Sequence, residues 1–131
     1  MNLTEKAYNE LSYSIIECCY AVHSELGPGL MESIYEACLV KELRDSGFNV
    51  KQQFPLPVIY KNEQLNKTFR VDLIVNDCIL VELKSVEYVM PVHKAQLVSY
   101  LKLANMKLGL LINFNEASLK NGIVRKLNGQ L

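Results

Sequence analysis

The sequence predicts an α/β fold in which a central mixed β-sheet is flanked by helices on both faces. The main observation is the order of the predicted elements, which runs helix, helix, three strands, helix, strand, with a short strand at the end. A second is the uninterrupted apolar run at residues 108–112, which is typical of a strand buried on both faces. A third is the length of 131 residues, half of them apolar, which suffices for one hydrophobic core but not for two. We therefore expect a single domain over residues 1–131.

Two helices are predicted at the start of the chain. Over residues 3–26 apolar side chains recur every three or four positions, as on one face of a helix, and Asn2 or Thr4 can serve as the N-cap. A Gly-Pro-Gly stretch then ends this helix. The second helix is expected over about residues 30–45, with Gly47 as its C-terminal breaker.

Extended segments follow the two helices. Residues 48–54 and 56–60 are interpreted as strands, but two prolines interrupt them and suit a sheet edge, because proline cannot donate a backbone hydrogen bond. Two stronger strands are predicted at residues 68–75 and 79–84, joined by a tight polar connection. The two stronger strands would form an antiparallel hairpin.

The last third of the chain predicts a crossover and a final hairpin. Pro91 opens a helix that we expect to end near Asn105, since proline fits the first helical turn. A right-handed crossover through this helix would bring the strand at residues 108–112 alongside the strand at 79–84. An Asn-Gly pair then predicts a hairpin turn before a last strand at 123–127.

The register of the hairpin between the two stronger strands decides whether its acids share a face. A two-residue loop at Asn76 and Asp77 would place Asp72 and Glu82 on opposite faces and mix apolar with charged positions. A three-residue loop that includes Cys78 gives one wholly apolar face. Its cross-strand pairs are Val75 with Ile79, Leu73 with Val81, and Val71 with Leu83. The other face carries Arg70, Asp72, Ile74, Leu80, Glu82 and Lys84.

In that register Asp72 lies directly across from Glu82, with the two Cβ atoms roughly 5 Å apart, where two carboxylates repel unless positive charge separates them. Lys84 lies on the same face opposite Arg70, so a purely structural ion cluster is one explanation. A divalent cation explains more, because two carboxylates and the Leu83 carbonyl are hard oxygen ligands of the kind that Mg²⁺ prefers. Lys84, beside such an ion, could orient or deprotonate an attacking water.

Two helices carry polar stripes that could border this site. Glu32, Tyr35 and Glu36 fall at three-and-four spacing on the second helix. Gln96 and Tyr100 are four residues apart on the third. Such stripes are weak evidence by themselves, because exposed helical glutamates usually meet only water. Their value depends on whether the fold points them toward the strand acids.

Taken in order, these features resemble the PD-(D/E)XK nuclease superfamily. More closely, residues 29–35, which read Gly-Leu-Met-Glu-Ser-Ile-Tyr, resemble the signature of the small GxxExxY proteins, a branch of that superfamily. Four further segments are similar to the other blocks of that group, namely residues 69–72, 81–85, 95–101 and 108–114. The resemblance covers nearly the whole chain and implies a restriction-endonuclease-like fold.

The resemblance also implies roles for individual residues. Asp72 and Glu82 would hold Mg²⁺ or Mn²⁺, and Lys84 would assist the nucleophilic water in cutting a phosphodiester bond of DNA or RNA. The helix acid is either Glu36, at the distance from the following glycine that many superfamily members use, or Glu32, which the GxxExxY signature names.

Three further side chains are expected around the site, where they would contact the substrate or support the residues that do. They are Gln96, Tyr100 and Tyr35. The chain departs from the superfamily motif at Val71, which stands in the place of the motif's proline. This substitution leaves the strand acid in position.

Charge and composition limit the function classes. The formal net charge of zero argues against a protein that binds nucleic acid by bulk electrostatics. Residues 1–50 carry three bases against eight acids, a balance of −5, whereas residues 86–131 carry six bases against two acids, a balance of +4. We therefore expect any phosphate contact to come from the C-terminal third.

Cysteine spacing and hydropathy indicate where the protein acts. The four cysteines contain no CxxC pair and are interpreted as reduced thiols rather than as zinc ligands. No apolar stretch approaches the roughly 18 residues of a membrane helix, and the first residues lack the order of a secretion signal. We expect a cytoplasmic protein that makes no membrane contact.

Two hypotheses from different classes follow. The first is a Mg²⁺- or Mn²⁺-dependent nuclease acting on DNA or RNA. The second is a module that keeps the nuclease fold to bind nucleic acid or a protein partner without cutting it. A third interpretation is a purely structural or dimerising protein, such as a homodimer, whose polar face forms only internal ion pairs. The intact acid, acid, lysine set favours the enzyme, whereas neutral charge and small size favour the module or an enzyme that depends on a partner.

Overall fold

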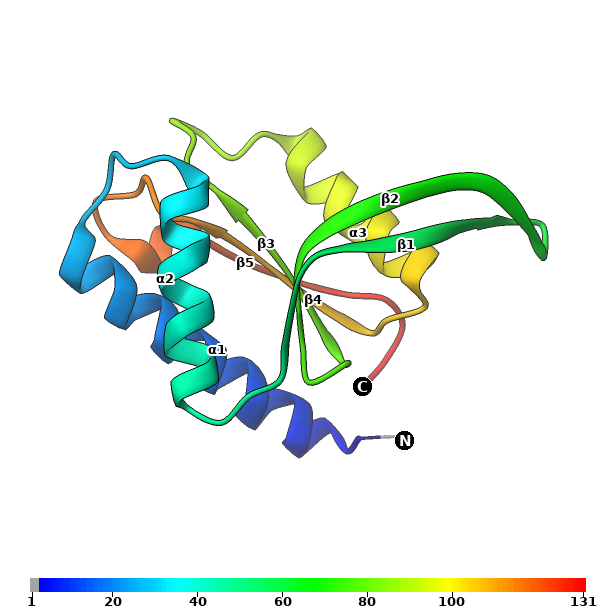
Figure 1. Cartoon of the computed structure of the whole chain (residues 1–131), viewed down its shortest axis with the longest axis horizontal. Helices are drawn as coiled ribbons and strands as arrows, with labels where there is room; N and C mark the ends of the chain where they lie inside the picture. The colour runs from blue at the N-terminus through cyan, green and yellow to red at the C-terminus, as the bar shows by residue number, and fades with distance from the viewer. Residues whose placement is uncertain (1–2) are drawn as a thin grey trace.

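The computed structural model describes residues 3–131 as three helices packed on one five-stranded sheet. The helices are α1 (Glu5–Leu26), α2 (Glu32–Asp45) and α3 (Pro91–Ala104). The strands are β1 (Val50–Tyr60), β2 (Glu63–Val75), β3 (Ile79–Lys84), β4 (Leu108–Asn113) and β5 (Ile123–Leu127). Figure 1 shows α1 and α2 together on one side of the sheet and the β1–β2 hairpin reaching out on the other.

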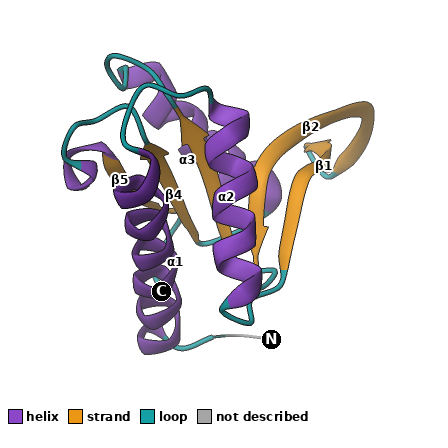
Figure 2. Ribbon diagram, turned by 60° about the vertical axis from the view of Figure 1, so that its left-hand side comes forward, coloured by secondary structure: helices purple, strands orange, loops and turns teal. Residues whose placement is uncertain are grey.

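The sheet is mixed, as predicted. Its strand order is β1-β2-β3-β4-β5, and all neighbours are antiparallel except β3 and β4, which are parallel. Helix α3 makes the crossover between these two parallel strands. Helices α1 and α2 cover one face and α3 covers the other (Figure 2), so the predicted α/β fold with helices on both faces is confirmed.

The helix ends follow from local chemistry. The Thr4 side chain accepts a hydrogen bond from the Ala7 N–H (3.1 Å) and is the N-cap of α1, whereas Asn2, the other predicted cap, lies outside the described residues. Gly27 ends the helix at a φ of 70°, a left-handed value that glycine adopts without strain. Pro91 occupies the first turn of α3, as predicted.

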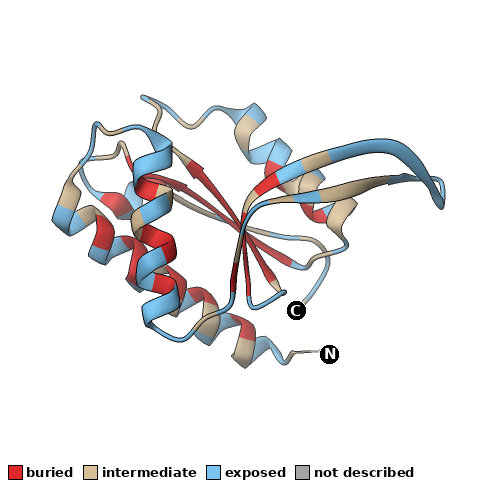
Figure 3. Cartoon of the chain, viewed as in Figure 1, coloured by how far each residue is buried: buried red, intermediate tan, exposed pale blue. Residues whose placement is uncertain are grey.

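Buried residues gather in the central strands and on parts of the helices (Figure 3), and they form two apolar clusters, one on each face of the sheet. The larger lies between the sheet and helices α1 and α2, and includes Leu73, Val81 and Leu110. The smaller lies under α3 and is formed by Val71, Ile74, Leu80, Leu97, Leu101 and Leu111. Within residues 3–131 no helix is both long enough and apolar enough to cross a membrane.

Strands β1 and β2 are longer than the sequence predicts. β1 continues through Pro55 and Pro57 to Tyr60, and β2 already begins at Glu63, so the two form one extended hairpin. β1 lies at the edge of the sheet, as its prolines indicate. The predicted break between two short strands is therefore wrong, because prolines at an edge need not interrupt a strand.

The hairpin turn predicted at Asn121 and Gly122 is also wrong. These two residues belong to a short 3-10 helix, Leu119–Gly122, within a longer connection from β4 to β5. Gly122 lies so close to the Asn113 carbonyl oxygen that a Cβ atom there would collide with it. The glycine therefore serves close packing against the end of β4, and β5 still pairs with β4 as an antiparallel strand.

Candidate metal centre

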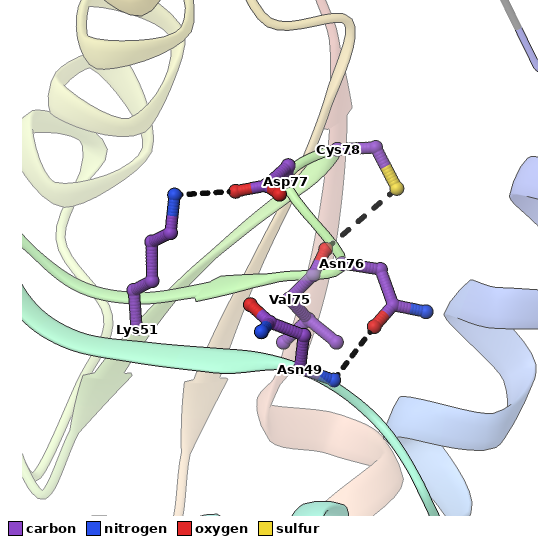
Figure 4. A network of polar contacts seen from close by, with 6 residues as sticks. All are labelled: Asn49, Lys51, Val75, Asn76, Asp77 and Cys78. Carbon is purple, nitrogen blue, oxygen red and sulfur yellow. Dashed lines mark hydrogen bonds and ion pairs between the residues drawn. The ribbon is translucent and has the colours of Figure 1, made fainter. Parts of the chain in front are cut away.

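A three-residue turn fixes the register of β2 against β3. Val75 pairs with Ile79, and the turn contains Asn76 and Asp77 at left-handed φ values of 51° and 55°, followed by Cys78. Figure 4 shows how side chains support it: the Asn49 N–H donates to Asn76 Oδ1 (2.8 Å), and Lys51 Nζ lies 2.6 Å from Asp77 Oδ1. The predicted register is thus confirmed over the three pairs that the structure forms, Val75 with Ile79, Ile74 with Leu80 and Leu73 with Val81.

The two strands separate immediately beyond the Leu73–Val81 pair, and carboxylates fill the gap. Asp72 Oδ2 accepts a hydrogen bond from the Leu83 N–H at 2.7 Å, replacing a backbone acceptor on β2. Glu82 Oε1 lies 3.4 Å from the Asp72 nitrogen and accepts from it. The two acidic side chains therefore meet in one gap between β2 and β3. Since the N–H and C=O of one strand residue point the same way, the Leu83 carbonyl also faces this gap.

A distortion of β1 lies directly beside Asp72. Gln53 has a φ of 45°, which is left-handed for a residue in a strand, and the pairing of β1 with β2 skips Gln53 and Asp72. Side-chain alternation is broken at this point, so Phe54 and Val71 turn toward α3. Val71 was expected on the face with Leu73; that expectation is wrong, because it assumed unbroken alternation along β2.

Gln53 also connects the helix acid to the strand acid. Its Nε2 atom donates to Glu36 Oε1 at 2.7 Å and to Asp72 Oδ1 at 3.2 Å. Gln52 donates to the other oxygen of Glu36 at 3.2 Å. Sequence reasoning did not identify Gln53. It lies two residues before the first proline of β1, and its place opposite Asp72 follows only from the register of the β1–β2 hairpin, which has no local sequence signal.

Electrostatics at the centre are dominated by Glu82. Its side chain belongs to a residue only 7% exposed, and burial raises the pKa of its carboxyl to about 9, with further increases from the charge of Asp72 and from a side-chain hydrogen bond with it. The hydrogen bond from the Asp72 backbone N–H lowers this pKa. Lys84 acts in the opposite direction and partly offsets the increase in the pKa. Burial raises the pKa of the Tyr100 phenol as well, and the carboxylates of Glu82 and Asp72 add to it.

Tyr100 and Lys84 reach the centre from the α3 side of the sheet. Tyr100 is half-buried and its ring lies 5.0 Å from that of Phe69, centroid to centroid. Lys84 is half-buried and shares a face of β3 with Glu82 and with Leu80, which packs under α3. Glu36 approaches from α2 on the opposite side, so groups from both faces converge on the gap in the sheet.

Within residues 3–131, the side chains of the other three predicted residues form no hydrogen bond or ion pair with Asp72, Glu82 or Glu36. Tyr35 is fully buried, stacks on Phe114 with ring centroids 4.5 Å apart, and donates from its hydroxyl to the Gly27 carbonyl at 2.6 Å. It holds the connection between α1 and α2 and is closed off from any substrate. Glu32 and Gln96 are exposed, and no side-chain hydrogen bond or ion pair joins either of them to another residue in the described part of the chain.

The donors fit a hard divalent cation only in part. Asp72, Glu82 and the Leu83 carbonyl supply oxygens around one gap, which is the donor type that Mg²⁺ and Mn²⁺ take. The high pKa of Glu82 indicates that two adjacent carboxylates there need a positive charge to ionise together. Among residues 3–131, however, no three His, Cys, Asp or Glu side chains are grouped closely enough to hold a metal ion. The Glu36 carboxylate is separated from the Asp72 carboxylate by the side-chain amide of Gln53, which donates to both.

Comparison with known families settles the broader assignment. The sequence model of the PD-(D/E)XK nuclease superfamily matches residues 9–126 of this chain. The chain belongs to the PD-(D/E)XK nuclease superfamily. No curated protein and no solved structure matches it. Superfamily membership agrees with the α/β architecture and indicates a nuclease-like phosphodiesterase, a class whose members generally use divalent metals such as Mg²⁺.

Proposed function

We propose that this PD-(D/E)XK protein is a metal-dependent nuclease that hydrolyses phosphodiester bonds of DNA or RNA. The observation that supports this most is the meeting of Asp72 and Glu82 in a gap of the sheet, with Lys84 on the same face of β3. Two adjacent carboxyls, one of them buried, destabilise the fold, and such perturbed acids are concentrated at binding and catalytic sites.

Each residue of the centre has a distinct task in the proposed reaction. Asp72, Glu82 and the Leu83 carbonyl would hold Mg²⁺ or Mn²⁺, with Glu36 as the helix acid in preference to Glu32. The bound metal would polarise the phosphate and make water a better nucleophile. Lys84 Nζ would orient the attacking water and stabilise negative charge on the phosphoryl oxygen.

Two polar neighbours would support these tasks. Gln53 positions Glu36 and Asp72, because one amide nitrogen donates to both carboxylates. The Tyr100 phenol, near Glu82 and Asp72, can donate a hydrogen bond to either acid or to a phosphate. Gln96 lies on the same helix, is exposed, and would contact the substrate.

We also infer a finer assignment from the sequence motifs. The Gly-Leu-Met-Glu-Ser-Ile-Tyr stretch at residues 29–35 supports membership of the GxxExxY group. The four cysteines are all free, which supports a cytoplasmic protein. A protein partner or homodimer would supply the specificity that such a small domain lacks.

One observation favours a second function, a non-cleaving module that binds nucleic acid or protein. Glu36 is engaged by the amides of both Gln52 and Gln53, so its carboxylate faces these donors rather than the acid pair. A protein with only two convergent carboxylates could keep the nuclease fold and lack the cleavage activity.

Mn²⁺ titration by calorimetry separates these functions from a purely structural role. We expect the wild-type protein to bind Mn²⁺ and Glu82→Ala to lose binding, because a ligand is removed. Asp72→Asn should also lose it, while its stability without metal stays near that of wild type, since Glu82 is protonated there and the asparagine oxygen can still accept from the Leu83 N–H. Absence of binding in the wild type would reject the metal centre.

Cleavage assays then separate the nuclease from the module. The wild-type protein with Mn²⁺ is incubated with single-stranded, duplex and branched DNA and with RNA. We expect products that disappear in Lys84→Ala and in Glu82→Ala. Products that persist in both variants would indicate a contaminant, and metal binding without any cleavage would favour the module.

A further inference from the structure

The β1–β2 hairpin beyond Gln53 and Asp72 forms an arm, residues 54–71, that projects from the rest of the molecule (Figures 1 and 3). Its outer part is exposed, including Ile59 at 49% and Tyr60 at 61%. In the described chain β2 pairs with β3 only from Leu73 onward, so both edges of the arm lack a neighbouring strand. A two-stranded ribbon with so little packing is marginally stable in water, which points to a partner along it.

Charge identifies the chemistry of that partner. The arm carries Lys61, Lys67 and Arg70, all exposed, against the single acid Glu63, a balance of +2. Helix α3, which packs against the root of the arm, adds two exposed lysines and no acid. Residues 1–50, which form α1 and α2 on the other face of the sheet, carry −5. A neutral chain therefore presents one basic side, which a polyanion would approach.

The arm leads directly to the carboxyl pair. Its base adjoins Asp72 on β2 and Gln53 on β1, whose side chains are joined by a hydrogen bond. Phe69 of the arm packs on Tyr100 of α3, whose phenol lies near Glu82. A molecule that lies along the arm and α3 thus passes the proposed metal centre.

We infer that the arm enters a groove of double-stranded DNA and holds the duplex across the carboxyl pair. The interpretation of the bound duplex as a substrate rests on the proposed function. The major groove of B-form DNA, about 12 Å wide, admits a two-stranded β-ribbon. The major groove of double-stranded RNA is too narrow and deep for side chains to reach. Lys61, Lys67 and Arg70 contact phosphates, and each contact releases a counterion.

The same features disfavour a second copy of the chain or an added peptide strand. Pro55 and Pro57 remove backbone donors from the β1 edge of the arm. Lys67 and Arg70 lie on the β2 strand, and the charges of two such arms would repel. A polyanionic duplex relieves this repulsion.

Fluorescence anisotropy with a short labelled DNA duplex tests the inference in EDTA, where no cleavage interferes. The test variant is Lys61→Ser with Lys67→Ser, and the control is Lys6→Ser with Lys41→Ser on the acidic helices, which removes the same charge. We expect the arm variant to bind about 10-fold more weakly, with the slope of log affinity against log salt reduced by about 2. The control should stay within about twofold of wild type.

Each other outcome has a definite meaning. Absence of duplex binding by the wild type at low salt, equal loss in both variants, or equal affinity for single-stranded DNA or duplex RNA overturns the inference. A dimer in light scattering that the arm variant breaks, with DNA affinity unchanged, also overturns it and identifies a second copy as the occupant. Arm-dependent duplex binding by a protein that cleaves neither DNA nor RNA upholds the inference and rejects the nuclease.

Discussion

Protonation of the buried Glu82 carboxyl makes the free energy of unfolding depend on pH. The carboxyl has a pKa of about 9 in the folded protein and an ordinary value of 4.5. Between these values the folded state holds a proton that the unfolded state has released, so the free energy of unfolding falls as pH rises. The stabilising contribution is complete below about pH 4.5 and is lost through about pH 9.

We therefore predict that metal-free wild-type protein loses stability relative to Glu82→Gln as pH increases from about 5.5 to 8.5. The slope of the difference approaches about 1.4 kcal/mol per pH unit, because one proton is linked to unfolding. Urea denaturation of both proteins in EDTA measures it. Saturating Mn²⁺ should remove the effect, since the cation holds the carboxylate ionised. Parallel pH profiles for the two proteins would contradict the burial of this acid.

Residue by residue, the sequence predicted the strand acids better than their surroundings. Asp72 and Glu82 could be placed together because one register alone gives the hairpin a consistent pattern of apolar and charged positions. Gln53 could not be found in this way, since a left-handed backbone at a glutamine has no local sequence signal. Tyr35 fits the signature spacing, yet its position in the core depends on Phe114, which is distant in sequence.

Among the elements, the turn at residues 76–78 determines whether the acids meet. Asp77 has a left-handed φ of 55° and forms an exposed ion pair with Lys51. A β-branched side chain is strained in this conformation by roughly 1–2 kcal/mol, whereas glycine is not. The ion pair itself contributes only about 0–1 kcal/mol at such an exposed position.

Comparing two substitutions at this position isolates the backbone effect. We predict that Asp77→Val is about 1 kcal/mol less stable than Asp77→Gly in urea denaturation, because both variants lose the ion pair and only valine adds strain. If the valine variant is the more stable of the two, the turn does not require its left-handed conformation, and the register would have another cause.

Strand lengths and connections were the elements that the sequence predicted least well. The break expected near Pro55 is absent because β1 is an edge strand, where a missing donor costs nothing. Asn121 and Gly122 form part of a 3-10 helix because close packing of Gly122 on the Asn113 carbonyl outweighs the preference of an Asn-Gly pair for a hairpin turn. In both places, contacts between residues distant in sequence determine the local structure.

At the scale of the whole molecule, the apolar clusters on the two faces of the sheet differ in size. The outer part of the arm packs on neither cluster. Phe54, Leu56 and Phe69 pack on the smaller cluster under α3, and the chain beyond them is largely exposed. β3 and β4, by contrast, are buried along nearly their whole length. The arm should therefore open without unfolding of the rest, because its opening exposes little apolar surface.

Hydrogen exchange followed by mass spectrometry measures this difference. We predict that amides of residues 59–68 exchange many times faster than those of β3 and β4, whose exchange requires global unfolding. Duplex DNA added in EDTA should slow exchange in the arm and leave β4 unchanged, since only the arm gains contacts. Arm amides protected as strongly as β4 in the free protein would show that the ribbon is already part of the cooperative core, and that its exposure does not mark a site for a partner.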